Sequence, residues 1–106
     1  MHNPLVGCWH LVGMAGVDAV DLGIEIDFRG DGRLFHSIQT GERWALSRLV
    51  YRIEGDTIIS DQLSAPEERS TRFTLEPDGR LRLDGPDSTT WYRRGPKRAP
   101  EYLNGK

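Results

Sequence analysis

Residues that could carry chemistry are few in this chain, and they are scattered. The 106 residues include three histidines, His2, His10 and His36, and one cysteine, Cys8. The chain contains no Gly-x-Ser-x-Gly elbow, phosphate loop, His-Glu-x-x-His motif or Cys-x-x-Cys pair, so the common catalytic signatures are absent. Catalysis is therefore the minority hypothesis, and the sequence calls for no cofactor.

His36 is the sharpest candidate among these residues. The strand pattern set out below places its ring on the same face as Phe28 and Leu34, where burial could tune its pKa or a ligand could bond to it. In an enzyme it would act as a general base, for instance in an isomerase or a cyclase. Two structural alternatives stay open, a core histidine satisfied by backbone or water and a histidine at an open end of the fold.

The sequence predicts no metal site. With Trp9 facing inward, His10 faces outward, and a site would need His36 together with carboxylates from distant strands. Cys8 has no base close to it in sequence and is interpreted as a small apolar filler. A single cysteine cannot form an internal disulfide, which fits a reducing, cytoplasmic location.

The elements that position these residues are strands. Turn sequences such as Gly30-Asp31-Gly32 and Pro77-Asp78-Gly79 recur at short intervals, and the segments between them alternate apolar with polar residues. We expect eight strands, over residues 5–12, 22–29, 33–39, 43–54, 57–63, 69–76, 80–84 and 89–94. Closure of such a meander removes exposed edges. The sequence thus predicts an all-β fold, a single up-and-down antiparallel β-barrel of about eight strands.

Turn geometry predicts which side chains face inward. The two x-Asp-Gly loops pair Phe28 with Leu34 and Leu75 with Leu81, and the two-residue Gly55-Asp56 turn pairs Ile53 with Ile58. The side chains expected inside are Ile24, Ile26, Phe28, Leu34, His36, Ile38, Tyr51, Ile53, Ile58, Ser60, Phe73, Leu75, Leu81 and Leu83. Trp44 has the opposite parity to Tyr51 unless a bulge intervenes, so its face stays open.

Composition excludes some classes of partner. The formal net charge is −2 and 28% of the residues are charged, which argues against a nucleic-acid-binding surface. No apolar run approaches the ~20 residues that a membrane span needs. The length suits one domain, and we expect a barrel domain over residues 1–94 and a C-terminal tail over 95–106, because Pro96 and Pro100 cannot continue a ladder.

Four short segments occur in order along the chain: Leu5-Val6-Gly7-Cys8-Trp9, Phe28-Arg29-Gly30-Asp31-Gly32-Arg33-Leu34, Tyr51-Arg52-Ile53-Glu54-Gly55-Asp56 and Thr90-Trp91-Tyr92-Arg93-Arg94. Together they resemble small bacterial lipocalin-like (calycin) domains, over residues 5 to 94. The resemblance implies a barrel that binds a small apolar molecule, with Gly7 and Trp9 at its floor and Arg93 or Arg94 stacked on the indole. Fatty-acid-binding barrels hold a carboxylate with an Arg-x-Tyr of the last strand. The aligned triplet here, Thr90-Trp91-Tyr92, keeps the tyrosine and lacks the arginine.

The predicted function is the binding of an apolar small molecule inside the barrel. The predicted ligand-binding residues are Trp9, His36, Tyr51, Ser60 and Tyr92. The alternative is a solid barrel that engages another protein through its surface, because an eight-stranded barrel is only just wide enough for its own side chains or one small ligand.

The same parity predicts an apolar patch on the outer face. It consists of Phe35, Val50, Ile59 and Leu63, from three consecutive strands. A monomer rarely leaves such a patch exposed. The tail could cover it through Tyr102 and Leu103, the connection near Val17 and Val20 could do so, or a second copy could. We predict a homodimer in which these strands pack face to face.

Overall fold

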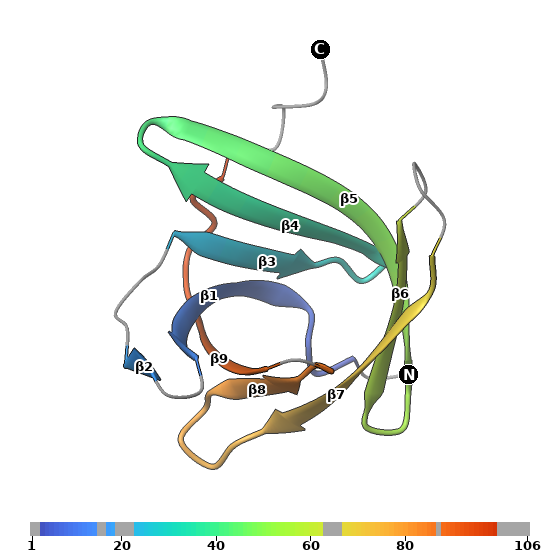
Figure 1. The fold of residues 1–106 in the computed structure, drawn as a ribbon. Coiled ribbons are helices and arrows are strands. Elements are labelled where there is room, and N and C mark those ends of the chain that lie inside the picture. The colour runs from blue at the N-terminus through green and yellow to red at the C-terminus, as the bar shows by residue number, and fades with distance from the viewer. Residues whose placement is uncertain (1–2, 15–16, 19–22, 63–66, 87, 100–106) are drawn as a thin grey trace.

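Antiparallel strands account for all the regular structure that the computed structural model describes, and Figure 1 shows them as a curved wall around a common interior. The described residues are 3–14, 17–18 (backbone alone), 23–62, 67–86 and 88–99. Their strands are β1 (Gly7–Met14), β2 (Val17–Asp18), β3 (Ile24–Phe28), β4 (Arg33–Thr40), β5 (Arg43–Glu54), β6 (Thr57–Gln62), β7 (Arg69–Leu75), β8 (Leu81–Asp84) and β9 (Thr89–Arg94). In this part of the chain no helix is long and apolar enough to span a membrane.

The strand order closes the sheet into a barrel. Neighbours follow the order β2-β1-β3-β4-β5-β6-β7-β8-β9, and β1 also pairs with β9. The short β2 pairs only with the end of β1, at Gly13 and Met14. The closed barrel therefore consists of β1 and β3 to β9, eight antiparallel strands in up-and-down order, which confirms the predicted fold class.

The predicted turns and registers are also confirmed. Gly32 and Gly79 have φ of 91° and 92°, the left-handed conformation that a three-residue Asp-Gly loop requires. The resulting registers pair Phe28 with Leu34, Leu75 with Leu81 and Ile53 with Ile58. Local turn chemistry thus sets which side chains face the interior, because a shift of one residue would reverse every face.

One connection differs in detail from the expectation, and the structure assigns the face of Trp44, which the sequence left open. The segment after β1 was expected to be one long connection, but Val17 pairs with Met14 in β2; Val20 lies outside the described residues. In β5 the pairing with β4 runs without a register shift from Arg43 to Val50. No bulge intervenes, so Trp44 keeps the parity opposite to Tyr51 and belongs to the outer face.

The core fills one end of the barrel. Its buried members are Leu5, Trp9, Leu11, Ile26, Phe28, Leu34, Tyr51, Ile58, Leu81 and Tyr92. Ile38 and Leu75 were expected inside, but 39% and 42% of their surfaces are exposed. Ile38 pairs with Ile24 and Leu75 with Leu81, so the expected inward parity of both residues is kept. Leu75 is the last residue of β7 and Ile38 lies two residues before the end of β4, and neither is buried in the core.

The predicted outer apolar patch is smaller than expected. Ile59 is only 9% exposed, whereas Phe35 and Val50 are half-buried; Leu63 lies outside the described residues. The guanidinium carbons of Arg29 and Arg33 lie 5.0 and 5.9 Å from the centre of the Phe35 ring and cover part of it. The expectation of open apolar surface at Ile59 is wrong, and the homodimer stays a prediction with less surface to support it.

Candidate functional site

A cavity of about 660 Å³ lies inside the barrel and is bounded in part by core side chains such as Phe28 and Tyr92. Its apolar lining comprises Ile26, Phe28, Leu34, Leu49, Ile58, Leu83 and Tyr92. Its polar lining comprises His36, Ser47, Ser60, Gln62, Glu67, Arg69 and Thr71. Glu67 and Arg69 are exposed, so the cavity reaches the surface beside β7. The interior is not filled by its own side chains, and this volume lies within the range of small-molecule sites.

The polar lining is concentrated on one side of the barrel. His36 of β4 is paired with Ser47 of β5, and Ser60 of β6 is paired with Arg69 of β7. Gln62 and Thr71 continue the same face of β6 and β7, because alternate residues of a strand share a face. We call His36, Ser47, Ser60, Gln62 and Thr71 the polar wall. The opposite side, which we call the apolar side, is formed by Ile26 and Phe28 of β3, Leu83 of β8 and Tyr92 of β9, whereas Leu34, Leu49 and Ile58 lie beside the polar wall on β4 to β6.

Most side chains of the polar wall make no hydrogen bond to the described residues. Those of His36, Ser47, Ser60 and Thr71 have no such partner in this part of the chain, whereas Gln62 has an interaction partner. Burial lowers the pKa of His36 below its ordinary value, because the charged ring would lose its hydration. Near neutral pH the imidazole is therefore uncharged and offers one donor and one acceptor to the cavity.

Tyr92 lines the cavity from β9, on the apolar side. Its ring is buried, and this burial raises the pKa of the phenol above its ordinary value. Three of the five predicted ligand-binding residues, His36, Ser60 and Tyr92, thus come together around one space.

Trp9 does not line the cavity but closes one end of the barrel. Its indole N–H donates to the carbonyl of Leu5 at 3.0 Å, and the guanidinium carbon of Arg94 lies 4.3 Å from the centre of its ring. Arg94 also donates to the carbonyl oxygens of Val6 and Pro4, at 2.8 and 2.6 Å. Of the two arginines considered for stacking, the structure therefore selects Arg94. Trp9 holds the segment before β1 across the barrel floor.

Tyr51 belongs to the same floor. Its hydroxyl donates to the carbonyl of Arg29 at 2.8 Å and accepts from the amide nitrogen of Asn3 at 2.8 Å. Its ring packs edge-on against Phe28, with ring centres 5.2 Å apart. Both polar functions of the hydroxyl are satisfied within the protein, so Tyr51 does not offer them to the cavity.

Sequence reasoning missed several cavity residues that its own parity rule could have found. Ser47 lies two positions from Leu49 and four from Tyr51, on the same face of β5. Gln62 continues the face of Ser60 in the same way. Glu67 lies outside the strands and had no such signal; its position depends on its backbone N–H, which donates to the Asp61 carboxylate at 2.8 Å.

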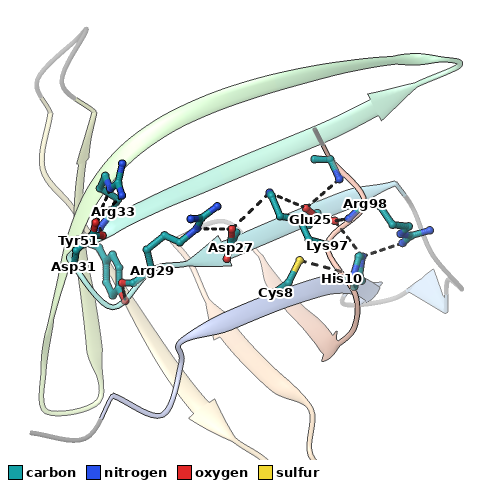
Figure 2. Close-up of polar contacts among 11 residues, drawn as sticks. Cys8, His10, Glu25, Asp27, Arg29, Asp31, Arg33, Tyr51, Lys97 and Arg98 are labelled. Carbon is teal, nitrogen blue, oxygen red and sulfur yellow. Dashed lines mark hydrogen bonds and ion pairs between the residues drawn. The ribbon is translucent and has the colours of Figure 1, made fainter. Parts of the chain in front are cut away.

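A second group of chemistry-bearing residues lies on the outer face of the barrel, as Figure 2 shows. Cys8 and His10 project from β1, and the register places them opposite Asp27 and Glu25 of β3. We call these four residues the outer polar cluster. The predicted outward orientation of His10 is confirmed, yet His10 is 7% exposed and Glu25 only 1%.

The beginning of the predicted tail covers this cluster. The backbone N–H groups of Arg98 and Ala99 donate to the two carboxylate oxygens of Glu25, at 2.8 and 3.3 Å. The Lys97 ammonium lies 3.5 Å from both Glu25 and Asp27 (Figure 2). Docking of the tail through Tyr102 and Leu103 was one alternative, and both residues lie outside the described part of the chain. Residues 95–99 dock through backbone and charge.

His10 is also bonded to the tail. Its Nε2 lies 2.7 Å from the carbonyl oxygen of Pro96, so this nitrogen donates, and its Nδ1 accepts from the Arg98 guanidinium at 2.9 Å. Ser37 pairs with Glu25 across β3 and β4 and is 1% exposed. Its hydroxyl is one buried group that has no partner among the described residues.

Ligand atoms of Cys8, His10 and Glu25 lie within 4.8 Å of one another, a donor set suited to zinc. The metal site weighed from the sequence was built on His36, so this group was not predicted. However, both ring nitrogens of His10 and both oxygens of Glu25 are bonded to the tail. Burial, followed by the charge of Glu25, raises the pKa of Cys8 to about 12, so the thiol keeps its proton. The cluster fits the tail better than it fits a metal ion.

Comparison with known proteins gives the fold and no function. No protein-family model matches the chain, and no curated protein matches it. Among solved structures, the chain is similar to an uncharacterized protein from Bacteroides eggerthii DSM 20697, with a TM-score of 0.69 and 16% sequence identity. The match covers 85% of this chain and 98% of the other. At this identity the likeness shows a shared fold alone.

Proposed function

We propose that this chain is a binding protein that takes one small, largely apolar molecule into its barrel cavity. The observation that carries the proposal is the cavity of about 660 Å³, with an apolar side and a polar wall. In this wall the side chains of His36, Ser47, Ser60 and Thr71 have no hydrogen-bond partner among the described residues. These side chains are partly buried around one space, so their polar groups are available to a ligand or to water. The resemblance to lipocalin-like domains agrees with this function.

The alternative of a solid barrel that engages a protein through its surface receives less support. That hypothesis expects a filled interior and an open apolar patch. The barrel has an open interior instead, and Arg29 and Arg33 partly cover Phe35 on the outer face. An enzyme using His36 as general base would need a second polar group of opposite role near it, and the register places only Ser47 directly opposite.

The test is the binding of Nile red, a neutral fluorophore whose emission rises in apolar surroundings. We expect saturable binding to the intact chain. Leu49→Trp places a large ring in the cavity, whereas Leu75→Trp makes the same change at a side chain that is 42% exposed and does not line it. Leu49→Trp should weaken binding about tenfold, or ~1.4 kcal/mol, and Leu75→Trp should leave it unchanged. Absence of saturable binding, or equal binding by the two variants, would overturn the proposal.

A further inference from the structure

The charge of the cavity lining is distributed unevenly. Among the described lining residues, only Glu67 and Arg69 carry a formal charge near neutral pH. Their side chains are 73% and 75% exposed, and Glu67 Oε2 lies 3.8 Å from Arg69 Nη2. The charged groups thus lie at the mouth and face each other, while the deeper polar wall consists of hydroxyls, an amide and an imidazole.

This distribution discriminates between ligand head groups. A carboxylate drawn to the depth of His36 would lose water and find no cation among the described lining residues there, which is unfavourable in a partly apolar site. An uncharged hydroxyl or carbonyl would lose much less hydration and would gain hydrogen bonds to groups that have no partner among the described residues, such as Ser47 and Ser60. The wall therefore favours a neutral polar group.

The charged groups at the mouth of the cavity also disfavour a carboxylate. Arg69 is the one cation of the described lining that a carboxylate could reach, and Glu67 faces it. The Glu67 backbone is held in place by its bond to Asp61, 2.8 Å from N to Oδ1. An entering carboxylate would have to displace Glu67 from Arg69 and approach a like charge, whereas a neutral head group meets neither obstacle.

We propose, resting on the proposed function, that the cavity selects an uncharged amphiphile, with its hydrocarbon body against the apolar side and a hydroxyl or carbonyl group against the polar wall. Glu67 acts as the specificity-determining residue that rejects carboxylates at the mouth. The ligand class is a neutral lipophilic alcohol, aldehyde or ketone, and the corresponding acids are excluded.

The experiment is displacement of Nile red by 1-decanol and by decanoate, which share a carbon chain and differ in head-group charge. It is run near neutral pH and below the concentration at which decanoate forms micelles. Decanol should compete about tenfold better than decanoate, the ratio that ~1.4 kcal/mol of differential binding gives. Glu67→Gln should narrow this ratio by raising decanoate affinity several-fold, because Arg69 becomes available to the carboxylate.

Glu68→Gln is the matched control. Glu68 is the next residue and an exposed acid, but it faces Arg52 at 3.4 Å and does not line the cavity, so its removal should leave the ratio unchanged. Decanoate binding as tight as decanol in the unaltered protein, or Nile red displaced by neither probe, would overturn the selectivity and leave the proposed function in place. An unchanged ratio in Glu67→Gln would remove the role of Glu67. Failure of Nile red itself to bind would remove both proposals.

Discussion

The polar wall of the cavity and the outer polar cluster have the same strand geometry, but they differ in how their polar groups are hydrogen-bonded. Both consist of alternate residues on neighbouring strands, as with His36 opposite Ser47 inside and His10 opposite Glu25 outside. Outside, the tail supplies a partner to each oxygen of Glu25 and to each nitrogen of His10. Inside, most of the wall meets only the cavity.

This difference separates a structural role from a binding role. A buried polar group with all its partners inside the protein holds the fold and has nothing left to offer a ligand. A polar group with no internal partner contributes little to the fold and remains available to a ligand. The presence of a histidine does not distinguish the two regions, since each contains one. The described part of the tail, residues 95–99, covers the outer polar cluster and does not line the cavity.

The largest expected effect is on the free energy of unfolding, and it compares Glu25 with its cross-strand neighbour Ser37. Glu25→Ala removes a carboxylate that is 1% exposed, leaves two backbone donors without their acceptor and leaves Lys97 with Asp27 alone. We expect it to lower the free energy of unfolding by about 3 kcal/mol, as loss of one partner of a buried charge pair does. Ser37→Ala, directly opposite on β4 and equally buried, removes a hydroxyl without a partner and should be neutral or stabilising.

Urea denaturation of the two variants beside the unaltered protein measures both changes. Equal destabilisation by Glu25→Ala and Ser37→Ala would mean that burial alone, and not the contacts of the tail, governs this face.

The next effect concerns the cavity. His36→Leu replaces the ring with an apolar side chain of similar size at a position without a hydrogen-bond partner among the described residues. It should weaken decanol binding about tenfold, or ~1.4 kcal/mol, while the free energy of unfolding stays the same or rises. Nile red binding should change little, because the dye depends on the apolar side.

Displacement titration and urea denaturation of the same preparation check the two halves of this prediction. A clear loss of stability in His36→Leu would instead identify His36 as a core histidine that the fold requires, which is one of the alternatives that the sequence left open.

A smaller effect concerns pH. Burial lowers the pKa of His36 in the folded state, so below about pH 6.5, the ordinary histidine pKa, the unfolded chain binds a proton that the folded chain does not. Stability should therefore fall as pH decreases from 6.5 toward the lowered folded pKa. His36→Gln should lose this part of the pH dependence.

Urea denaturation of both proteins across this pH range isolates the difference. If the stability of His36→Gln changed with pH in parallel with that of the unaltered protein, His36 would not be buried as a neutral ring.

The strands and their inward faces were predictable because the signals are local. The Asp-Gly loop with Gly32 fixes the register of β3 and β4, and alternation then carries Phe28, Leu34 and His36 inward together. The position of Ser60 follows from the Gly55 turn in the same way. Short-range geometry of this kind needs no knowledge of the rest of the chain.

The outer polar cluster was not predictable because its contacts are not local. Glu25 and Lys97 are 72 positions apart, and β1 and β3 are not joined by a tight hairpin, so no turn fixes the opposition of His10 and Glu25. The burial of Ile59 was missed for a related reason, since parity gives the face of a residue and not what covers it. The volume of the cavity likewise depends on packing that alternation does not describe.

The smallest expected effect is that of zinc, which should leave the melting temperature of the protein unchanged. Zinc would need the Cys8 thiolate, one ring nitrogen of His10 and an oxygen of Glu25. The pKa of about 12 keeps the thiol protonated near neutral pH, and the tail occupies the nitrogen and the oxygens. A ligand that binds only the folded state raises the melting temperature, so thermal denaturation with excess Zn²⁺ tests this directly. A rise that Cys8→Ser abolishes would show that the tail yields to a metal ion and that the outer polar cluster, like the cavity, is a binding site.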